Sequence, residues 1–95
     1  MDPPSYGRGP GGEIWKIEDA VYPLICLCEK LLSDNPLFFL INSYTTGLAP
    51  AVLTYMLSLA VKSRHGGTVE ASEIGLPVTQ SGLVLPCGAS GRWSV

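Results

Sequence analysis

The sequence predicts an α/β fold, with its elements in the order loop, helix, strand, helix, strand, strand. Three observations support this prediction. Apolar residues recur at helical spacing over residues 17–33, an unbroken apolar run follows at Leu37–Ile41, and apolar and polar residues alternate from Thr68. We expect residues 1–95 to be one portion of a single domain, with a loop over residues 1–15 and the regular elements over residues 16–95.

The opening loop begins with the run Asp2-Pro3-Pro4-Ser5-Tyr6. Each proline fixes φ and removes a backbone donor, so this run should be rigid and should hold a carboxylate, carbonyl groups and an aromatic ring in place. A glycine-rich stretch follows up to Ile14. Its spacing is not that of a dinucleotide-binding fingerprint, and it predicts a mobile loop or a linker.

The first helix is predicted over residues 17–33, where apolar residues are three and four apart. Pro23 is acceptable in this helix if Asp19 lies near the N-cap, because the proline then falls in the first turn. Cys26 and Cys28 lie within the helix. Small buried hydrophobes are the expected role for both cysteines.

The run Leu37–Ile41 predicts a strand, which follows a turn at residues 33–36. Because the run does not alternate, both of its faces should be covered, as in the central strand of a parallel sheet. The polar run Asn42–Gly47 comes directly after it. In open α/β sheets, ligands bind at this carboxyl end of the strands.

The second helix should begin at Pro50, where a missing donor costs nothing, and end near the basic residues before Gly66. His65, the one histidine, is expected to be a solvated residue at that helix end. Strands are predicted at residues 68–72 and 83–85. No helix separates them, so they should form an antiparallel hairpin.

Composition indicates that the chain belongs to a larger core. It is 46% hydrophobic and only 15% charged, against about 25% charged in typical domains. The net charge of −2 gives no basic field for nucleic acid, so any cationic surface should lie elsewhere. The spacing Cys26-x-Cys28 does not suit zinc, and Cys87 leaves the three cysteines without a paired framework. We expect no metal and a reducing, cytoplasmic location.

The run Asp2–Tyr6 resembles the Asp-Pro-Pro-x-aromatic signature that follows the fourth strand of class I S-adenosylmethionine-dependent methyltransferases. Extended to Gly12, it is similar to the branch that includes large-subunit ribosomal RNA methyltransferases. The order of the predicted elements also matches the second half of that Rossmann-like fold. The resemblance implies that the chain is the C-terminal portion of one methyltransferase domain, and that this domain is incomplete.

The resemblance also implies roles for individual residues. Asp2, Pro3, Pro4 and Tyr6 would be the catalytic residues: the carboxylate and the two proline carbonyls accept hydrogen bonds from a base, and the tyrosine ring stacks on that base, which is expected to belong to RNA. Further substrate contacts would come from Ser5 and from the residues that follow the fifth strand, Asn42, Ser43 and Tyr44.

The cofactor implied is S-adenosyl-L-methionine, but its main binding motifs precede the signature in the family and are absent from these residues. A missing N-terminal half of the domain should supply them, and this chain alone should be inactive. Relatives that methylate cytosine C5 carry a cysteine just after the fifth strand, where this chain has Asn42-Ser43-Tyr44. Cys87 is the remaining candidate nucleophile, and nothing in the sequence would activate its thiol.

Two functional classes other than a methyltransferase remain as alternatives. The chain could be a non-catalytic interaction fragment or a pseudoenzyme remnant. A membrane-associated protein is the less favoured alternative: residues 37–61 carry no charge and are long enough to cross a bilayer, but the polar run Asn42–Gly47 interrupts them.

Overall fold

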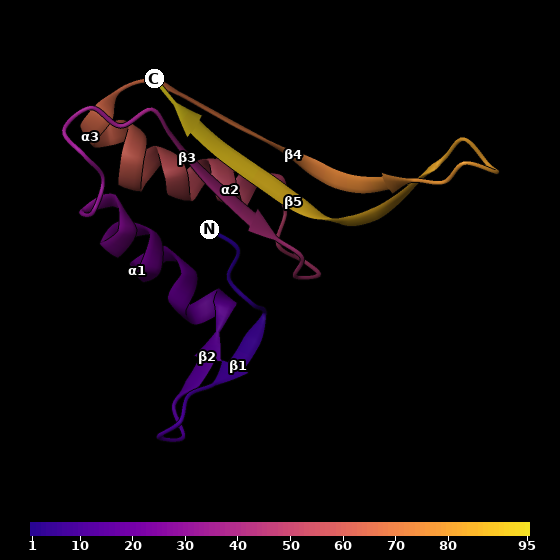
Figure 1. Cartoon of the computed structure of the whole chain (residues 1–95), viewed down its shortest axis with the longest axis horizontal. Helices are drawn as coiled ribbons and strands as arrows, with labels where there is room; N and C mark the ends of the chain where they lie inside the picture. The colour runs from indigo at the N-terminus through magenta and orange to yellow at the C-terminus, as the bar shows by residue number, and fades with distance from the viewer.

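The computed structural model describes residues 1–95 and shows a mixed α/β arrangement. Its elements are β1 (Tyr6–Arg8), β2 (Ile14–Lys16), α1 (Ile17–Glu29), β3 (Phe38–Ser43), α2 (Pro50–Leu57), the π-helical turn η1 (Ser58–Lys62), α3 (Ser63–His65), β4 (Thr68–Pro77) and β5 (Val84–Ser94). The main sheet has the order β3-β5-β4, and both of its strand pairs are antiparallel. A separate two-stranded hairpin, β1–β2, projects away from it (Figure 1).

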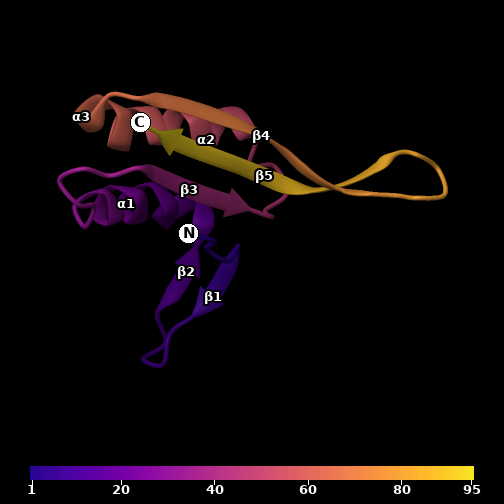
Figure 2. The ribbon, with the colours of Figure 1, turned by 45° about the horizontal axis from the view of Figure 1, so that its top comes forward.

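The helices lie on one side of this sheet, as Figure 2 shows. The core between the layers is formed by buried apolar residues of α1, α2, η1, β3 and β5. Gly91 in β5 shows how closely the layers approach, because a Cβ atom added there would lie 2.9 Å from the Cβ of Leu53 and 3.2 Å from Cδ1 of Leu57. A side chain at this position would push α2 away from the sheet.

The strand β3 is an edge strand with one covered face, so the prediction of a central strand buried on both faces is wrong for this chain. Phe39 is 8% exposed and Ile41 is fully buried against the helices, whereas Phe38 is 62% exposed on the opposite face. The sequence pattern correctly signals a strand with two apolar faces. These 95 residues contain helices for only one of those faces.

The outer edge of β3 carries hydrogen bonds of parallel geometry at one position. The N–H of Asn42 donates to the carbonyl of Met1 at 3.0 Å, and the amino group of Met1 donates to the carbonyl of Leu40. Two bonds that flank one residue of the neighbouring strand, here Ile41, are the pattern of a parallel pair. The backbone of Met1 thus lies where a strand parallel to β3 would lie.

Helix α1 begins at Ile17 and ends at Glu29, four residues earlier than predicted. Its N-cap is Lys16, not a residue near Asp19, so Pro23 lies inside the helix and outside the first turn. The start is fixed by a tertiary hydrogen bond, in which the N–H of Ile17 donates to the carbonyl of Ser5 at 3.1 Å. Pro23 leaves the carbonyl of the exposed Asp19 without its helical donor, and water can satisfy that carbonyl.

The C-terminal hairpin is antiparallel as predicted, but both of its strands are much longer. β5 has 11 residues and forms the centre of the sheet, although the sequence indicates a strand only at residues 83–85. The full length of β5 is not evident from the sequence, because Pro86, Gly88 and Gly91 interrupt the apolar alternation. Trp93 near its end is fully buried and donates from Nε1 to the carbonyl of Gly66 at 2.7 Å.

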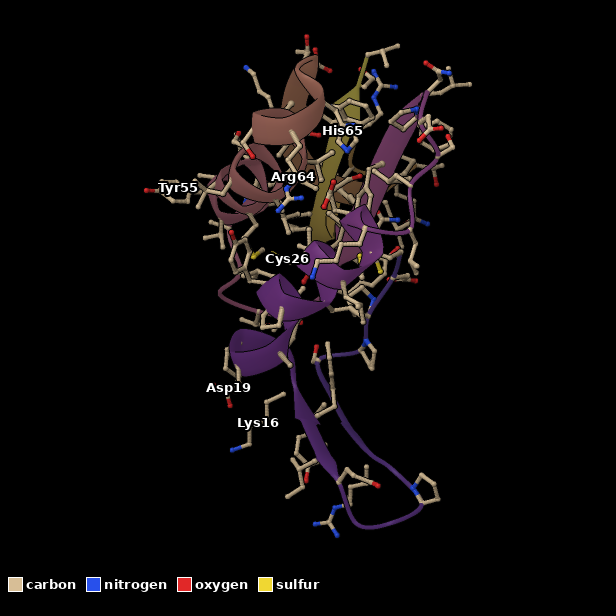
Figure 3. All side chains as sticks on the ribbon, turned by 90° about the vertical axis from the view of Figure 1, so that its left-hand side faces the viewer. Lys16, Asp19, Cys26, Tyr55, Arg64 and His65 are labelled. Carbon is tan, nitrogen blue, oxygen red and sulfur yellow. The ribbon has the colours of Figure 1, made fainter.

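His65 is not the solvated helix-end residue that the sequence predicts. Its Nε2 lies 2.9 Å from Oε1 of Glu29, and its ring centroid lies 5.7 Å from that of Trp93. Nε of Arg64 lies 3.7 Å from Oε2 of the same glutamate. Figure 3 shows Arg64 and His65 directed toward α1. The sequence conceals this cluster because Glu29 is 36 residues away from His65.

The three cysteines are free and half-buried, and Cys26 and Cys28 pack against the core. Neither is fully buried. Among the helices of the structure, none is both long enough and apolar enough to cross a membrane.

Candidate functional site

The Asp2–Tyr6 loop lies beside the carboxyl end of β3. The hydroxyl oxygens of Ser5 and Thr45 are 2.6 Å apart, and this hydrogen bond joins the loop to the polar run that follows the strand. The carbonyl of Met1 accepts a hydrogen bond from the N–H of Asn42, so the start of the loop lies at the same end of the sheet. The two segments that the sequence assigns to substrate contact therefore lie side by side.

Two hydrogen bonds fix the loop to the rest of the molecule through its carbonyl groups. The indole N–H of Trp15 donates to the carbonyl of Pro4 at 2.7 Å, and the N–H of Ile17 donates to the carbonyl of Ser5. The sequence predicts the carbonyl of Pro4 as an acceptor for a base. In the structure this carbonyl is engaged by Trp15, which makes Pro4 an anchor of the loop.

Two groups of the loop are exposed to a ligand. The carboxylate of Asp2 is exposed and has no partner, whereas Pro3 is buried, although its carbonyl accepts no hydrogen bond within the chain. The ring of Tyr6 is 51% exposed, and its hydroxyl accepts a hydrogen bond from Nε of Arg8 at 3.3 Å. An exposed carboxylate and an aromatic face within five residues can bind the edge and the face of a planar ring.

The residues predicted at the end of β3 differ in their access to solvent. Asn42 is half-buried, and its backbone N–H is used by Met1. Ser43 is only 1% exposed, and its hydroxyl accepts a hydrogen bond from the N–H of Thr45, so it cannot act as the substrate contact predicted from the sequence. Its position in β3 turns its side chain toward the helices. Tyr44 is 53% exposed and remains accessible.

A hollow of about 350 Å³ opens beside the residues that follow β3. It lies between residues 44–50, Glu73 of β4 and residues 86–89 of β5. Gly88 permits the close approach of the two walls, because a Cβ atom there would lie 2.3 Å from the carbonyl oxygen of Ser43 and 2.8 Å from Cδ1 of Tyr44. The sequence alone does not predict that Ser43 and Tyr44 lie against this glycine and leave no room for a side chain.

Cys87 lines the hollow, and its thiol donates to the carbonyl of Ile74 at 3.4 Å. No basic side chain lines the hollow, and Glu73 is its one charged residue. A thiol in such surroundings has no cation that would favour the thiolate. The geometry therefore gives no support to a nucleophilic role for Cys87.

Residues 6–16 form an ordered hairpin, so the prediction of a mobile glycine loop is wrong. Tyr6 pairs with Lys16, and Arg8 pairs with Ile14. Glu13 closes the turn: its carbonyl accepts from the N–H of Gly9 at 2.8 Å, and its carboxylate accepts from the N–H of Gly11 at 3.0 Å. The glycines thus serve a tight turn, which sequence spacing alone does not distinguish from a flexible linker.

The turns that lead into the helices of this chain differ from the glycine-rich turn that binds a nucleotide cofactor in many α/β folds. α1 follows β2 directly, and α2 follows a loop with the single glycine Gly47, so no glycine-rich turn leads from a parallel strand into a helix. No group of three His, Cys, Asp or Glu side chains is placed to hold a metal ion.

The fold resembles part of a known enzyme. The crystal structure of the SAM dependent methyltransferase from Agrobacterium tumefaciens matches it with a TM-score of 0.87 and 24% sequence identity. The match covers 98% of this chain and 31% of that enzyme, so the chain spans about a third of its length. No protein-family profile matches the chain. No curated protein matches it.

Proposed function

We propose that this chain is the acceptor-binding portion of an S-adenosylmethionine-dependent methyltransferase, and that its acceptor is a base of RNA. The observation that carries the proposal is the position of the Asp2–Tyr6 loop within a fold that matches a methyltransferase over 98% of the chain. The loop lies at the carboxyl end of β3, where open α/β sheets bind their ligands.

The chemistry of the loop supports a nucleobase as the acceptor. An enzyme that modifies a base takes it out of its stack and holds it by hydrogen bonds at its edge and by contact with its face. The exposed carboxylate of Asp2 can accept hydrogen bonds from the edge, and the half-exposed ring of Tyr6 can stack on the face. Trp15 and Thr45 hold the loop in place through Pro4 and Ser5.

The cofactor supplies the methyl group. The residues of this chain position the acceptor. Such positioning lowers the activation barrier because it converts a bimolecular encounter into an effectively unimolecular step. The groups that bind the cofactor would belong to a partner segment that completes the domain. The outer edge of β3, with its parallel hydrogen bonds to Met1, is the edge to which a strand of that segment would add.

A fused protein tests this proposal. It consists of the portion of the Agrobacterium enzyme that the match leaves uncovered, joined to this chain in place of the matched portion. We expect it to transfer labelled methyl groups from S-adenosylmethionine to bacterial large-subunit ribosomal RNA. Circular dichroism and size-exclusion chromatography establish beforehand that it is folded and monodisperse.

The contribution of the loop is measured with a matched pair of variants. Tyr6→Ala removes a stacking surface worth about 1–3 kcal/mol, so the affinity for RNA should fall about 5- to 150-fold while cofactor affinity stays nearly constant. Tyr55→Ala removes an equally large ring from the exposed face of α2 and should change neither. A folded fused protein that binds cofactor and methylates no RNA contradicts the proposal and favours a non-catalytic fragment.

A further inference from the structure

The hairpin β1–β2 has one face that the sequence does not reveal. Its register pairs Tyr6 with Lys16 and Arg8 with Ile14, and all four of these residues are exposed. Because side chains alternate between the faces of a strand, these four share one face. We call them the hairpin face. Trp15, between them in sequence, turns to the other face and contacts Pro4.

The hairpin face combines two cations with two apolar side chains and carries no anion. Ile14 is 59% exposed, and the guanidinium of Arg8 lies against the hydroxyl of Tyr6. The nearest acid in the hairpin, Glu13, directs its carboxylate at the N–H of Gly11 in the turn. Basic side chains beside an exposed aromatic ring, here Arg8 and Lys16 beside Tyr6, are typical of surfaces that bind single-stranded nucleic acid.

The acids near the hairpin do not neutralise this face by direct pairing. Glu18 and Asp19 lie in the first turn of α1, where negative charge complements the helix dipole. Neither of them forms an ion pair with Lys16 or Arg8. Figure 3 shows the side chain of Lys16 extended into open space at the base of the hairpin. Both cations are therefore free to bind an anion.

We propose that the hairpin face binds the phosphates of a single RNA strand next to the acceptor base, with Arg8 and Lys16 as the phosphate contacts. This inference rests on the proposed function, since the hairpin continues directly from the Asp2–Tyr6 loop. Tyr6 belongs to both surfaces. The distance along β1 from Tyr6 to Arg8 is on the order of 7 Å, which matches phosphates of the nucleotides adjacent to a base on the loop.

This proposal also accounts for the acidic composition of the chain. A net charge of −2 disfavours binding to RNA in general, but Arg8 and Lys16 lie on a ribbon that protrudes from the rest of the chain and neither forms an ion pair with an acid. The sequence gives no sign of this pair of cations, because the strand register gathers Arg8 and Lys16 from eight residues apart.

The experiment measures binding of a fluorescein-labelled 12-nucleotide single-stranded RNA to the 95-residue chain by fluorescence anisotropy, at several salt concentrations between 50 and 200 mM. Each phosphate contact on a single strand contributes about 0.7 to the slope of log K against log salt. Arg8→Ala and Lys16→Ala should each lower the slope by about that amount. The ratio of the RNA association constant of the unmodified chain to that of each variant should then fall about 2.6-fold between 50 and 200 mM salt.

Two further variants distinguish local contacts from overall charge. Lys30→Ala removes one exposed positive charge at the far end of α1 and should leave the slope unchanged. Arg8→Lys keeps the charge on the hairpin face and should keep the slope. Equal losses for Lys30→Ala and Lys16→Ala would overturn the proposal, and so would absence of RNA binding by the unmodified chain.

Failure of this inference is distinguishable from failure of the proposed function. If the fused protein methylates RNA with the same apparent affinity after Arg8→Ala and Lys16→Ala are combined, the hairpin face is not a phosphate site and the methyltransferase proposal stands. If the 95-residue chain binds RNA through these two residues while the fused protein methylates nothing, the hairpin face stands and the activity does not.

Discussion

The indole N–H of Trp15 donates a hydrogen bond to the carbonyl of Pro4 across 11 residues of sequence, at 2.7 Å. Through this bond the hairpin holds the Asp2–Tyr6 loop, because β2 carries Trp15 and β1 continues from the loop. Two prolines make the loop stiff, but stiffness alone does not orient it. The hairpin supplies the orientation through this bond.

Replacing Trp15 with Phe keeps an aromatic ring but removes its donor. The carbonyl of Pro4 then loses its partner, and the free energy of unfolding should fall by about 0.5–1.5 kcal/mol. Urea denaturation of the chain measures this loss. Ile14→Ala, at the neighbouring exposed position, serves as the control and should change stability by no more than about 0.5 kcal/mol. A similar effect of the two substitutions would show that the hydrogen bond does not fix the loop.

Phe39 and Phe38 are adjacent in β3 but face opposite sides of it. Phe39→Asp places an unpaired carboxylate in the core, and the loss of stability should exceed about 3 kcal/mol, seen as loss of the cooperative unfolding transition. Phe38→Asp changes an exposed position and should shift stability by about 0.5 kcal/mol or less in the isolated chain. If Phe39→Asp leaves unfolding unchanged, β3 does not pack against the helices as described.

Gly88 has no room for a side chain, whereas Gly7 has no atom within 4 Å of an added Cβ. Gly88→Ala should separate the end of β3 from β5 and cost about 1–3 kcal/mol, while Gly7→Ala should be nearly neutral. Thermal unfolding followed by circular dichroism compares the two. Equal stability of both variants would argue against the contact between β5 and residues 43–44.

Glu29 is a buried carboxylate that contacts His65 and Arg64 on a segment far along the chain. Glu29→Ala removes hydrogen bonds to charged or polar groups and leaves His65 without this partner, so stability should fall by about 1.5–3 kcal/mol. Glu18→Ala removes the same side chain from an exposed site in the same helix and should cost much less. Chemical denaturation at neutral pH measures both, and equal losses would refute the role of the cluster.

The 95-residue chain alone should not bind S-adenosylmethionine tightly, because none of its helices begins from a glycine-rich turn after a parallel strand. Its apolar β3 edge, with Phe38 exposed, should promote self-association. Isothermal titration calorimetry of a monodisperse sample tests the first expectation. Saturable binding at micromolar cofactor would reveal a site on these residues that the geometry does not show.

The sequence by itself determined the elements whose cause is local. Apolar spacing in Ile17–Glu29 and the proline at residue 50 predict both long helices, and the run at Leu37–Ile41 predicts a strand. The composition of the chain also predicts more apolar surface than a domain of this size can bury. The Asp2–Tyr6 resemblance led to the methyltransferase fold, and the structural match agrees with that fold.

Only the tertiary structure decided the features whose cause is a distant residue. Pairing with two neighbours makes a strand of Val84–Ser94 despite its proline and glycines, since backbone hydrogen bonds and close packing outweigh weak local preference. The pairing of β1 with β2 orders the glycine turn and gathers Arg8 and Lys16 on one face. Burial removes Ser43 from the site, because a strand's alternation depends on which face its neighbours cover.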